Sequence, residues 1–124
     1  MDPILASGVD IVIDHFALPD PLRGANDPAF RNFLGYGRRR RVWVKVSAHY
    51  RAGPESVALN AYPMLRDAFG LTRLIWGSDW PHTNFEQAQD YAAARGFFER
   101  MVPDAAERAV ILIDNPWALC RFTG

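Results

Sequence analysis

Three short apolar runs along the chain have the pattern of buried strands. They span residues 9–14, 42–47 and 73–78. Each run is rich in β-branched or aromatic residues, and polar residues follow it directly, which is typical of strands. In the second run valines alternate with larger or polar residues, so the two sets are expected on opposite faces of a strand.

The first helical pattern lies between the first two runs. Residues 27–37 begin with Asp27 as a candidate N-cap and Pro28 at the first helical position. Gly35 or Gly37 is the expected end of this helix, because glycine commonly follows the last helical turn.

A second helix is predicted for residues 55–70, between the second and third runs. Val57, Ala61, Leu65 and Ala68 recur there at helical spacing. Gly70 is the candidate C-cap, and Pro63 is expected to kink the helix or to start a fresh turn.

Two further helical segments follow the third run. Residues 85–102 form the longest predicted helix, and its apolar stripe contains Tyr91, Ala94, Phe97, Phe98 and Met101. Residues 103–122 open with a proline and an acidic first turn. We expect this segment to break at Asn115 and Pro116 and to resume as a short terminal helix.

The predicted order of elements is β, α, β, α, β, α, α, which indicates an α/β fold with a parallel sheet. Three parallel strands cannot close a barrel, and a typical (β/α)8 barrel needs about 250 residues. With 124 residues the chain is predicted to be a part of such a barrel. We treat residues 1–124 as one partial barrel domain whose two sheet edges are open to self-association.

Composition narrows the classes of function. Fourteen basic and fourteen acidic side chains cancel, so no overall field favours nucleic acid or membrane binding. The arginine run at residues 38–41 is expected to be a solvated loop; salt-sensitive oligonucleotide binding would indicate otherwise. The single cysteine, Cys120, excludes an internal disulfide, fits a cytoplasmic location and is expected in the core. No apolar run is long enough for a membrane span, and the N-terminus lacks a basic signal-peptide region.

Polar and ionisable residues gather directly after each predicted strand. Because the carboxyl ends of parallel strands meet at one edge, these residues are expected to share a site. The first strand delivers Asp14 and His15, the second Ser47, His49, Tyr50 and Arg51, and the third Ser78, Asp79, Trp80 and His82.

Four blocks of sequence carry a resemblance to a known family. "VIDHF", "VWVKVSAHYR", "RLIWGSDWPHT" and "ILIDNPWALCRF" resemble the amidohydrolase-related (amidohydrolase family 2) metal-dependent hydrolases, in the 2-pyrone-4,6-dicarboxylate lactonase and sugar lactonase branch. The resemblance implies a TIM-type (β/α)8 barrel of which this chain supplies the C-terminal portion, about three β/α units. The His-x-His pair of the family's opening strand is missing from this sequence.

The resemblance also implies roles. Asp79 corresponds to the general acid/base, and His15 lies beside the scissile carbonyl or ligates a metal. Arg51 matches an arginine that holds a substrate carboxylate. The resemblance does not decide whether the site binds a metal. It implies either a divalent ion such as zinc or, in the lactonase branch, a metal-free site.

The resulting hypothesis is hydrolysis of a small carboxylated lactone or cyclic ester. Asp79 would take a proton from the attacking water, aided by desolvation from Trp76 and Trp80. His15 would stabilise the oxyanion. Arg51, Tyr50, Ser47 and His82 are the predicted substrate-binding residues.

Structural roles compete with these assignments. Asp79 could cap a short turn closed by Pro81, His15 could be a satisfied core histidine, and Arg51 could pair with Glu55. The sequence favours a role for His49 in the site no more than it favours no role there. Trp76 and Trp80 are expected to pack against other residues and not to bind substrate. The rival function is a catalytically silent truncated fragment, and the isolated chain is expected to be inactive.

Overall fold

The computed structural model describes residues 2–39 and 41–120. Arg40, in the arginine run, and residues 121–124, at the end of the predicted terminal helix, lie outside the described residues. The helices are α1 (Asp2–Ala6), α2 (Pro28–Leu34), α3 (Glu55–Phe69), α4 (Tyr91–Met101), α5 (Ala105–Ala109) and α6 (Asn115–Cys120), and the strands are β1 (Ile11–Ile13), β2 (Val42–Lys45) and β3 (Leu74–Ile75).

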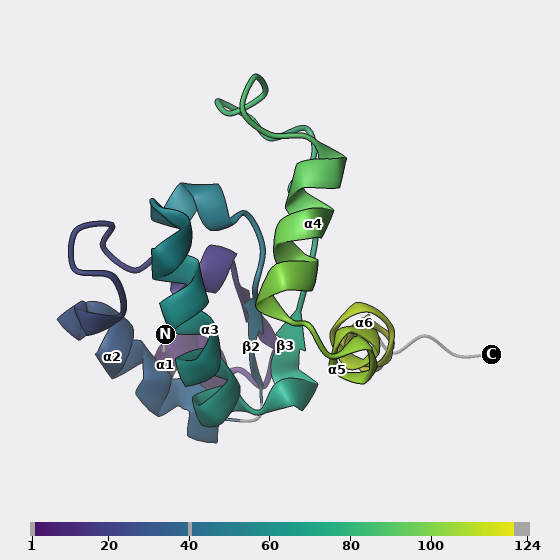
Figure 1. Ribbon diagram of the computed structural model, residues 1–124. Helices are drawn as coiled ribbons and strands as arrows, with labels where there is room; N and C mark the ends of the chain where they lie inside the picture. Colours follow the sequence, from purple (N-terminus) through teal and green to yellow (C-terminus); the bar gives the residue numbers. More distant parts are fainter. Residues whose placement is uncertain (1, 40, 121–124) are drawn as a thin grey trace.

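Short 3-10 helices and one π-helical turn join these elements. The 3-10 helices are η1 (His15–Ala17), η2 (Gly24–Asn26), η3 (Gly35–Arg38), η4 (His49–Ala52) and η5 (Leu71–Arg73), and the π-helical turn is η6 (Val110–Asp114). Figure 1 shows the strands flanked by helices, with the loop between β3 and α4 extending beyond the rest of the chain.

The three strands form one parallel sheet in the order β1-β2-β3, as the alternation of elements predicts. Each strand is shorter than its predicted range. Residues with positive φ follow each strand a few positions after it ends, namely His15, Ala48 and Asp79. The backbone leaves the extended conformation at these residues.

The core lies on one face of the sheet. Val42 and Val44 of β2 pack in one cluster with Leu65 of α3 and Phe98 of α4. The alternate residues of β2 point to the other face, where Trp43 is only half-buried. The helices therefore cover one face of the sheet, as they cover the outer face of an α/β barrel.

The first two predicted helices agree with the structure in most details. The Asp27 side chain caps α2 by accepting from the Ala29 N–H, Pro28 is its first residue, and Gly35 is its C-cap. Gly70 caps α3 with a φ of 77°. Pro63 lies inside α3, which continues through it as one helix.

The later helices differ from the prediction. α4 begins at Tyr91, not near residue 85, because the Asp90 side chain accepts from the Ala93 N–H and fixes the first turn there. Ala94, Phe97, Phe98 and Met101 are buried as predicted, whereas Tyr91 is exposed.

The expected break at Asn115 and Pro116 does not occur. The helical path continues through the wider π turn η6 into α6. A wider turn accommodates a residue that cannot donate a backbone hydrogen bond. The side chain of Asn115 is buried there and donates to the carbonyl oxygens of Leu71 and Leu74, at 2.7 and 2.6 Å, which ties α6 to β3.

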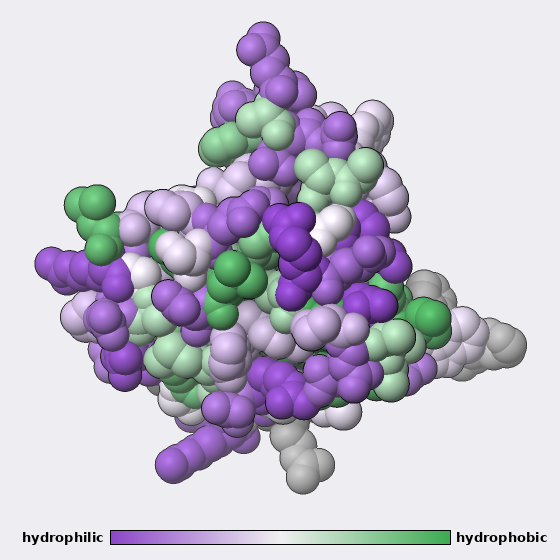
Figure 2. Space-filling model, in the orientation of Figure 1, coloured by the Kyte–Doolittle hydropathy of each residue, from purple (hydrophilic) through white to green (hydrophobic). Residues whose placement is uncertain are grey.

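The surface is mixed in character. The face shown in Figure 2 is mostly hydrophilic, with hydrophobic residues in separate small groups. Cys120, expected in the core, is exposed at the end of α6. Within residues 2–39 and 41–120, no helix is both long enough and apolar enough to cross a bilayer.

Candidate active site

The backbone turns sharply at the carboxyl end of every strand. His15 follows β1 with φ of 51°, Ala48 follows β2 with φ of 53°, and Asp79 follows β3 with φ of 63°. Residues other than glycine adopt this left-handed conformation rarely, and such residues cluster at functional sites. These turns bring the polar residues that follow each strand to the same edge of the sheet.

Asp79 is the centre of this edge. Its Oδ2 atom accepts a hydrogen bond from the Tyr50 hydroxyl at 2.6 Å and another from Arg51 Nε at 2.6 Å. Its Oδ1 atom faces His15 Nε2 at 3.8 Å. Within the described part of the chain, Oδ1 has no hydrogen bond, so one carboxylate oxygen is hydrogen-bonded and the other only faces His15.

Two further side chains join the network from its two ends. His15 Nδ1 lies 3.2 Å from Ser47 Oγ, and His82 Nδ1 lies 3.0 Å from the Tyr50 hydroxyl. The structure therefore brings together all six residues singled out from the sequence, which come from three strand ends. The side chain of Asp79 bonds across the site, so its alternative role as the cap of a local turn is wrong.

The network shifts the acidity of its members. Burial favours a higher pKa for Asp79, but the hydrogen bonds from Tyr50 and Arg51 and the charges of Arg51 and His15 outweigh it, so the pKa of Asp79 is lowered. Burial and the hydrogen bond to Asp79 raise the pKa of Tyr50. At neutral pH Asp79 is therefore ionised and Tyr50 keeps its proton.

Arg51 is fixed by more than its ion pair. Its Nη2 donates to the carbonyl oxygen of Thr83 at 3.0 Å, and its guanidinium carbon lies 5.4 Å from the ring centre of Tyr50 and 5.3 Å from that of Phe85. The alternative that Arg51 pairs with Glu55 is wrong, because Glu55 pairs with Arg100.

Sequence reasoning missed Thr83 and Phe85. The contact of Thr83 is made by its backbone carbonyl, which leaves no mark in the sequence. Phe85 does have a signal in the sequence, since it is an aromatic residue two positions after the "GSDWPHT" block.

The two tryptophans and the remaining charged residues near the strands make contacts outside the Asp79 network. Trp76 packs against Phe98 with ring centres 5.2 Å apart, whereas Trp80 is 74% exposed, so its predicted packing is wrong. Lys45 pairs with Asp14 at 3.2 Å on the open side of the sheet. Arg41, at the end of the arginine run, pairs with Asp10 at 3.6 Å.

The described residues do not form a complete metal site. His15 and Asp79 place one nitrogen and one oxygen 3.8 Å apart, and no group of three or more histidine, cysteine or acidic residues in the described part of the chain is arranged to hold a metal ion. A catalytic zinc site takes three protein ligands. The residues present therefore do not fit a metal on their own.

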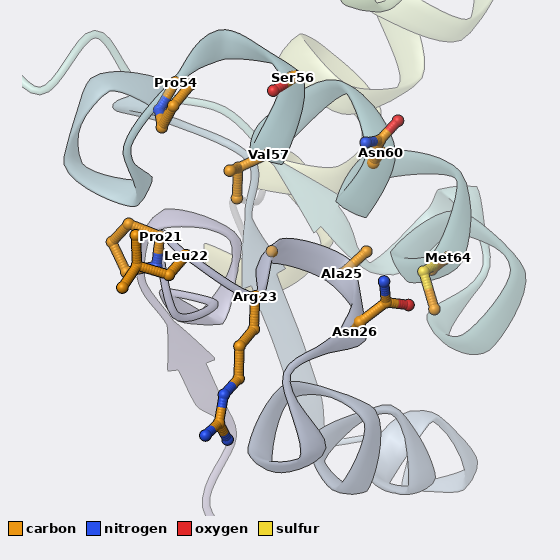
Figure 3. A pocket seen from close by; sticks show the side chains of 11 residues that line it. Pro21, Leu22, Arg23, Ala25, Asn26, Pro54, Ser56, Val57, Asn60 and Met64 are labelled. Atoms are coloured by element: carbon orange, nitrogen blue, oxygen red, sulfur yellow. The ribbon is translucent and has the colours of Figure 1, made fainter.

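A cavity lies away from this network. It has a volume of about 410 Å³, and in Figure 3 it is bordered by the loop that contains Pro21 and Asn26 and by the start of α3. Its lining has no imidazole or carboxylate, and the guanidinium of Arg23 points away from Val57 and Asn60. The ionisable side chains that the sequence singled out gather around Asp79 and not in this cavity.

Comparison with known proteins identifies the family. The family model described as "Amidohydrolase" matches residues 5–122. The chain belongs to the amidohydrolase family. Its fold is accordingly a portion of a TIM-type barrel, which agrees with the parallel sheet and its helices.

Relatives of this amidohydrolase chain include lactone hydrolases. It is 32% identical to a 2-pyrone-4,6-dicarboxylate hydrolase of Comamonas testosteroni over 88% of this chain and 40% of the relative. It is 30% identical to a 4-sulfomuconolactone hydrolase of Rhizobium radiobacter over 93% of this chain and 40% of the relative.

A solved relative is similar in structure as well. The crystal structure of a probable 2-pyrone-4,6-dicarboxylic acid hydrolase from Acinetobacter baumannii, with citric acid bound, matches with a TM-score of 0.89 and 39% identity. The match covers 97% of this chain and 47% of that one. The chain thus spans less than half the length of these relatives.

Proposed function

We propose that this chain carries the catalytic aspartate of a hydrolase that opens a small carboxylated lactone or cyclic ester. The observation that carries the proposal is the asymmetric holding of Asp79, with Oδ2 bound by Tyr50 and Arg51 and Oδ1 free toward His15. The names of the relatives support the reaction class, and the citric acid in one of them supports a carboxylated substrate.

The steps follow from the side chains. Oδ1 of Asp79 accepts a proton from a water molecule as that water attacks the ester carbonyl. His15 stabilises the negative charge that develops on the carbonyl oxygen, and Ser47 orients the His15 ring through Nδ1. The ring oxygen leaves as an alcohol after it takes up the proton from Asp79, which restores the carboxylate.

Arg51 has a double role in this proposal. Its Nε keeps Asp79 ionised, and its Nη2 holds the Thr83 carbonyl. The Nη1 group is left to bind a substrate carboxylate, a contact that adds affinity for an anionic substrate. Because the pKa of Asp79 is lowered, its carboxylate is ionised at neutral pH and can accept a proton, but it is a weaker base than an ordinary aspartate.

A catalytically silent fragment is the second candidate. It is favoured by the length of the match, since the chain covers 40% of the Comamonas testosteroni hydrolase. Among the described residues, His15 Nε2 is the one group that faces Oδ1 of Asp79, and a single group is little for this chemistry. Further side chains would have to come from strands outside this match. We therefore expect the chain by itself to hydrolyse 2-pyrone-4,6-dicarboxylate no faster than buffer does.

Complementation tests the proposal. The chain is mixed or co-expressed with a polypeptide that carries the part of the Comamonas testosteroni hydrolase outside the match, and loss of 2-pyrone-4,6-dicarboxylate is followed by absorbance. Turnover is expected only with both parts present. Asp79→Asn should then lower kcat by about 100- to 10,000-fold, the range for removal of a general base.

The matched control is Asp14→Asn. Asp14 is a carboxylate at the same edge of the sheet but is exposed and paired with Lys45, so its removal should leave kcat nearly unchanged. Turnover that survives Asp79→Asn would contradict the proposed role of Asp79. A correctly assembled complex with no turnover would favour the silent fragment.

A further inference from the structure

His82 is a buried member of the Asp79 network, and its side chain makes no hydrogen bond with the side chain of Asp79 or His15 among those that the described residues form. It is 2% exposed, and its Nδ1 atom lies 3.0 Å from the Tyr50 hydroxyl. Its Nε2 atom is buried and has no hydrogen-bond partner among the described residues. A side chain held in this way is poorly placed to bind substrate directly, which was its predicted role.

The direction of the hydrogen bonds in this chain is fixed by Asp79. An ionised carboxylate only accepts hydrogen bonds, so the single proton of the Tyr50 hydroxyl must lie in the 2.6 Å contact with Oδ2. The Tyr50 oxygen can then only accept from His82. His82 Nδ1 must therefore carry a hydrogen.

The protonation state of His82 follows from its surroundings. The tautomer with hydrogen on Nε2 would set two lone pairs against each other at Nδ1 and the Tyr50 oxygen. The doubly protonated ring would bury a charge whose Nε2–H has no acceptor among the described residues. The neutral ring with hydrogen on Nδ1 avoids both penalties.

We infer that His82 is a positioning residue, which donates from Nδ1 to Tyr50 so that the Tyr50 hydroxyl donates to Asp79 Oδ2 and leaves Oδ1 as the reacting oxygen. Only the role of Oδ1 as the reacting oxygen rests on the proposed function; the direction of the hydrogen bonds does not. The backbone of His82 supports it: a φ of 61° and the hydrogen bond from its N–H to the Asp79 carbonyl, at 2.7 Å, hold the ring behind Tyr50.

The tautomer of His82 is measured on the chain without substrate. Long-range ¹H–¹⁵N correlation spectra of the histidine rings, assigned by substituting each of the three histidines in turn, distinguish the two tautomers. We expect His82 to be neutral with hydrogen on Nδ1, although free histidine prefers hydrogen on Nε2. Hydrogen on Nε2, or on both nitrogens, would overturn the inference.

Two variants sharpen this experiment. Tyr50→Phe removes the acceptor, so His82 should revert to the tautomer with hydrogen on Nε2. Ser47→Ala removes the partner of His15 and should leave the His82 tautomer as it is. A Tyr50→Phe spectrum identical to that of the unchanged chain would overturn the inference, and if that variant does not fold, the spectrum of the unchanged chain decides.

A kinetic readout separates positioning from substrate binding in the complemented enzyme. His82→Leu should lower kcat by about 10- to 100-fold with little change in KM, because the base is misplaced and no substrate contact is lost. His82→Asn should restore most of kcat, since its amide nitrogen replaces Nδ1 and asparagine tolerates positive φ. A raised KM with an unchanged kcat would overturn the inference. The spectra need no turnover, so they stand whether or not the proposed function fails.

Discussion

At the scale of single residues, His49 is a buried imidazole whose role is structural. Its ring stacks on Phe97 with ring centres 3.7 Å apart. Burial lowers the pKa of His49 from the ordinary value of 6.5, with a smaller opposing effect of Glu55. The unfolded chain therefore binds a proton at His49 at a higher pH than the folded chain does.

The stability of the chain should accordingly fall as the pH falls below about 6.5, and be fully retained above it. His49→Phe keeps the stack on Phe97 and removes the titration, so it should reduce the loss of stability between about pH 7 and about pH 5. Urea denaturation of the unchanged chain and of His49→Phe at these two pH values measures the loss of stability in each. An equal loss in both chains would mean that His49 does not contribute.

Which residues share the site could be predicted from the sequence, but not how they bond. Parallel strands end at one edge, so Asp79, His15 and Arg51 had to be near one another once the strands were recognised. The partner of Arg51 could not be predicted, because Asp79 lies 28 positions away while Glu55 lies closer along the chain. The fold of the loop after β3 decides between them. The catalytic and binding roles of these residues remain predictions.

At the scale of elements, periodicity located the strands and the buried faces of the helices, because both depend on the apolar pattern alone. The start of α4 was missed because the helical pattern of residues 85–90 is overridden by the cap at Asp90. The terminal helix was predicted to break, since proline opposes a regular α-helix but not a wider π turn. The helix α1, for which no pattern was identified, was not predicted at all.

Gly37 lies directly against the backbone of α3. A Cβ atom there would overlap the backbone carbonyl of Ala68 on α3, and backbone cannot move aside as a side chain can. Gly37→Ala should therefore destabilise the chain by about 1–3 kcal/mol, as overpacking does.

Gly35→Ala is the matched control for this prediction. Gly35 is also in the turn that follows α2, has a φ of −60°, and has open space where its Cβ would lie. Alanine there should be neutral or stabilise the chain by up to about 1 kcal/mol. Thermal denaturation of the two variants compares them, and equal effects would mean that the contact with Ala68 is not decisive.

At the scale of the whole molecule, the sheet is covered by helices on one side and open on the other. Val12 of β1 pairs in register with Trp43 of β2, so both lie on the open face, where Val12 is exposed. Among the described residues β1 and β3 each pair with one strand, so each has one edge of backbone groups without a neighbouring strand there. In a full barrel the remaining strands cover this face and pair with both edges.

We propose that two copies of the isolated chain associate through these edges, because unpaired parallel strands and exposed apolar side chains favour pairing. Sedimentation velocity should show a weight-average coefficient that rises with concentration. Val12→Lys should suppress the rise, since a charge on the open face of an edge strand opposes pairing. Leu59→Lys is the control: Leu59 is 42% exposed, against 39% for Val12, but lies on α3. A monomer at every concentration, or equal effects of both lysines, would contradict association through the sheet.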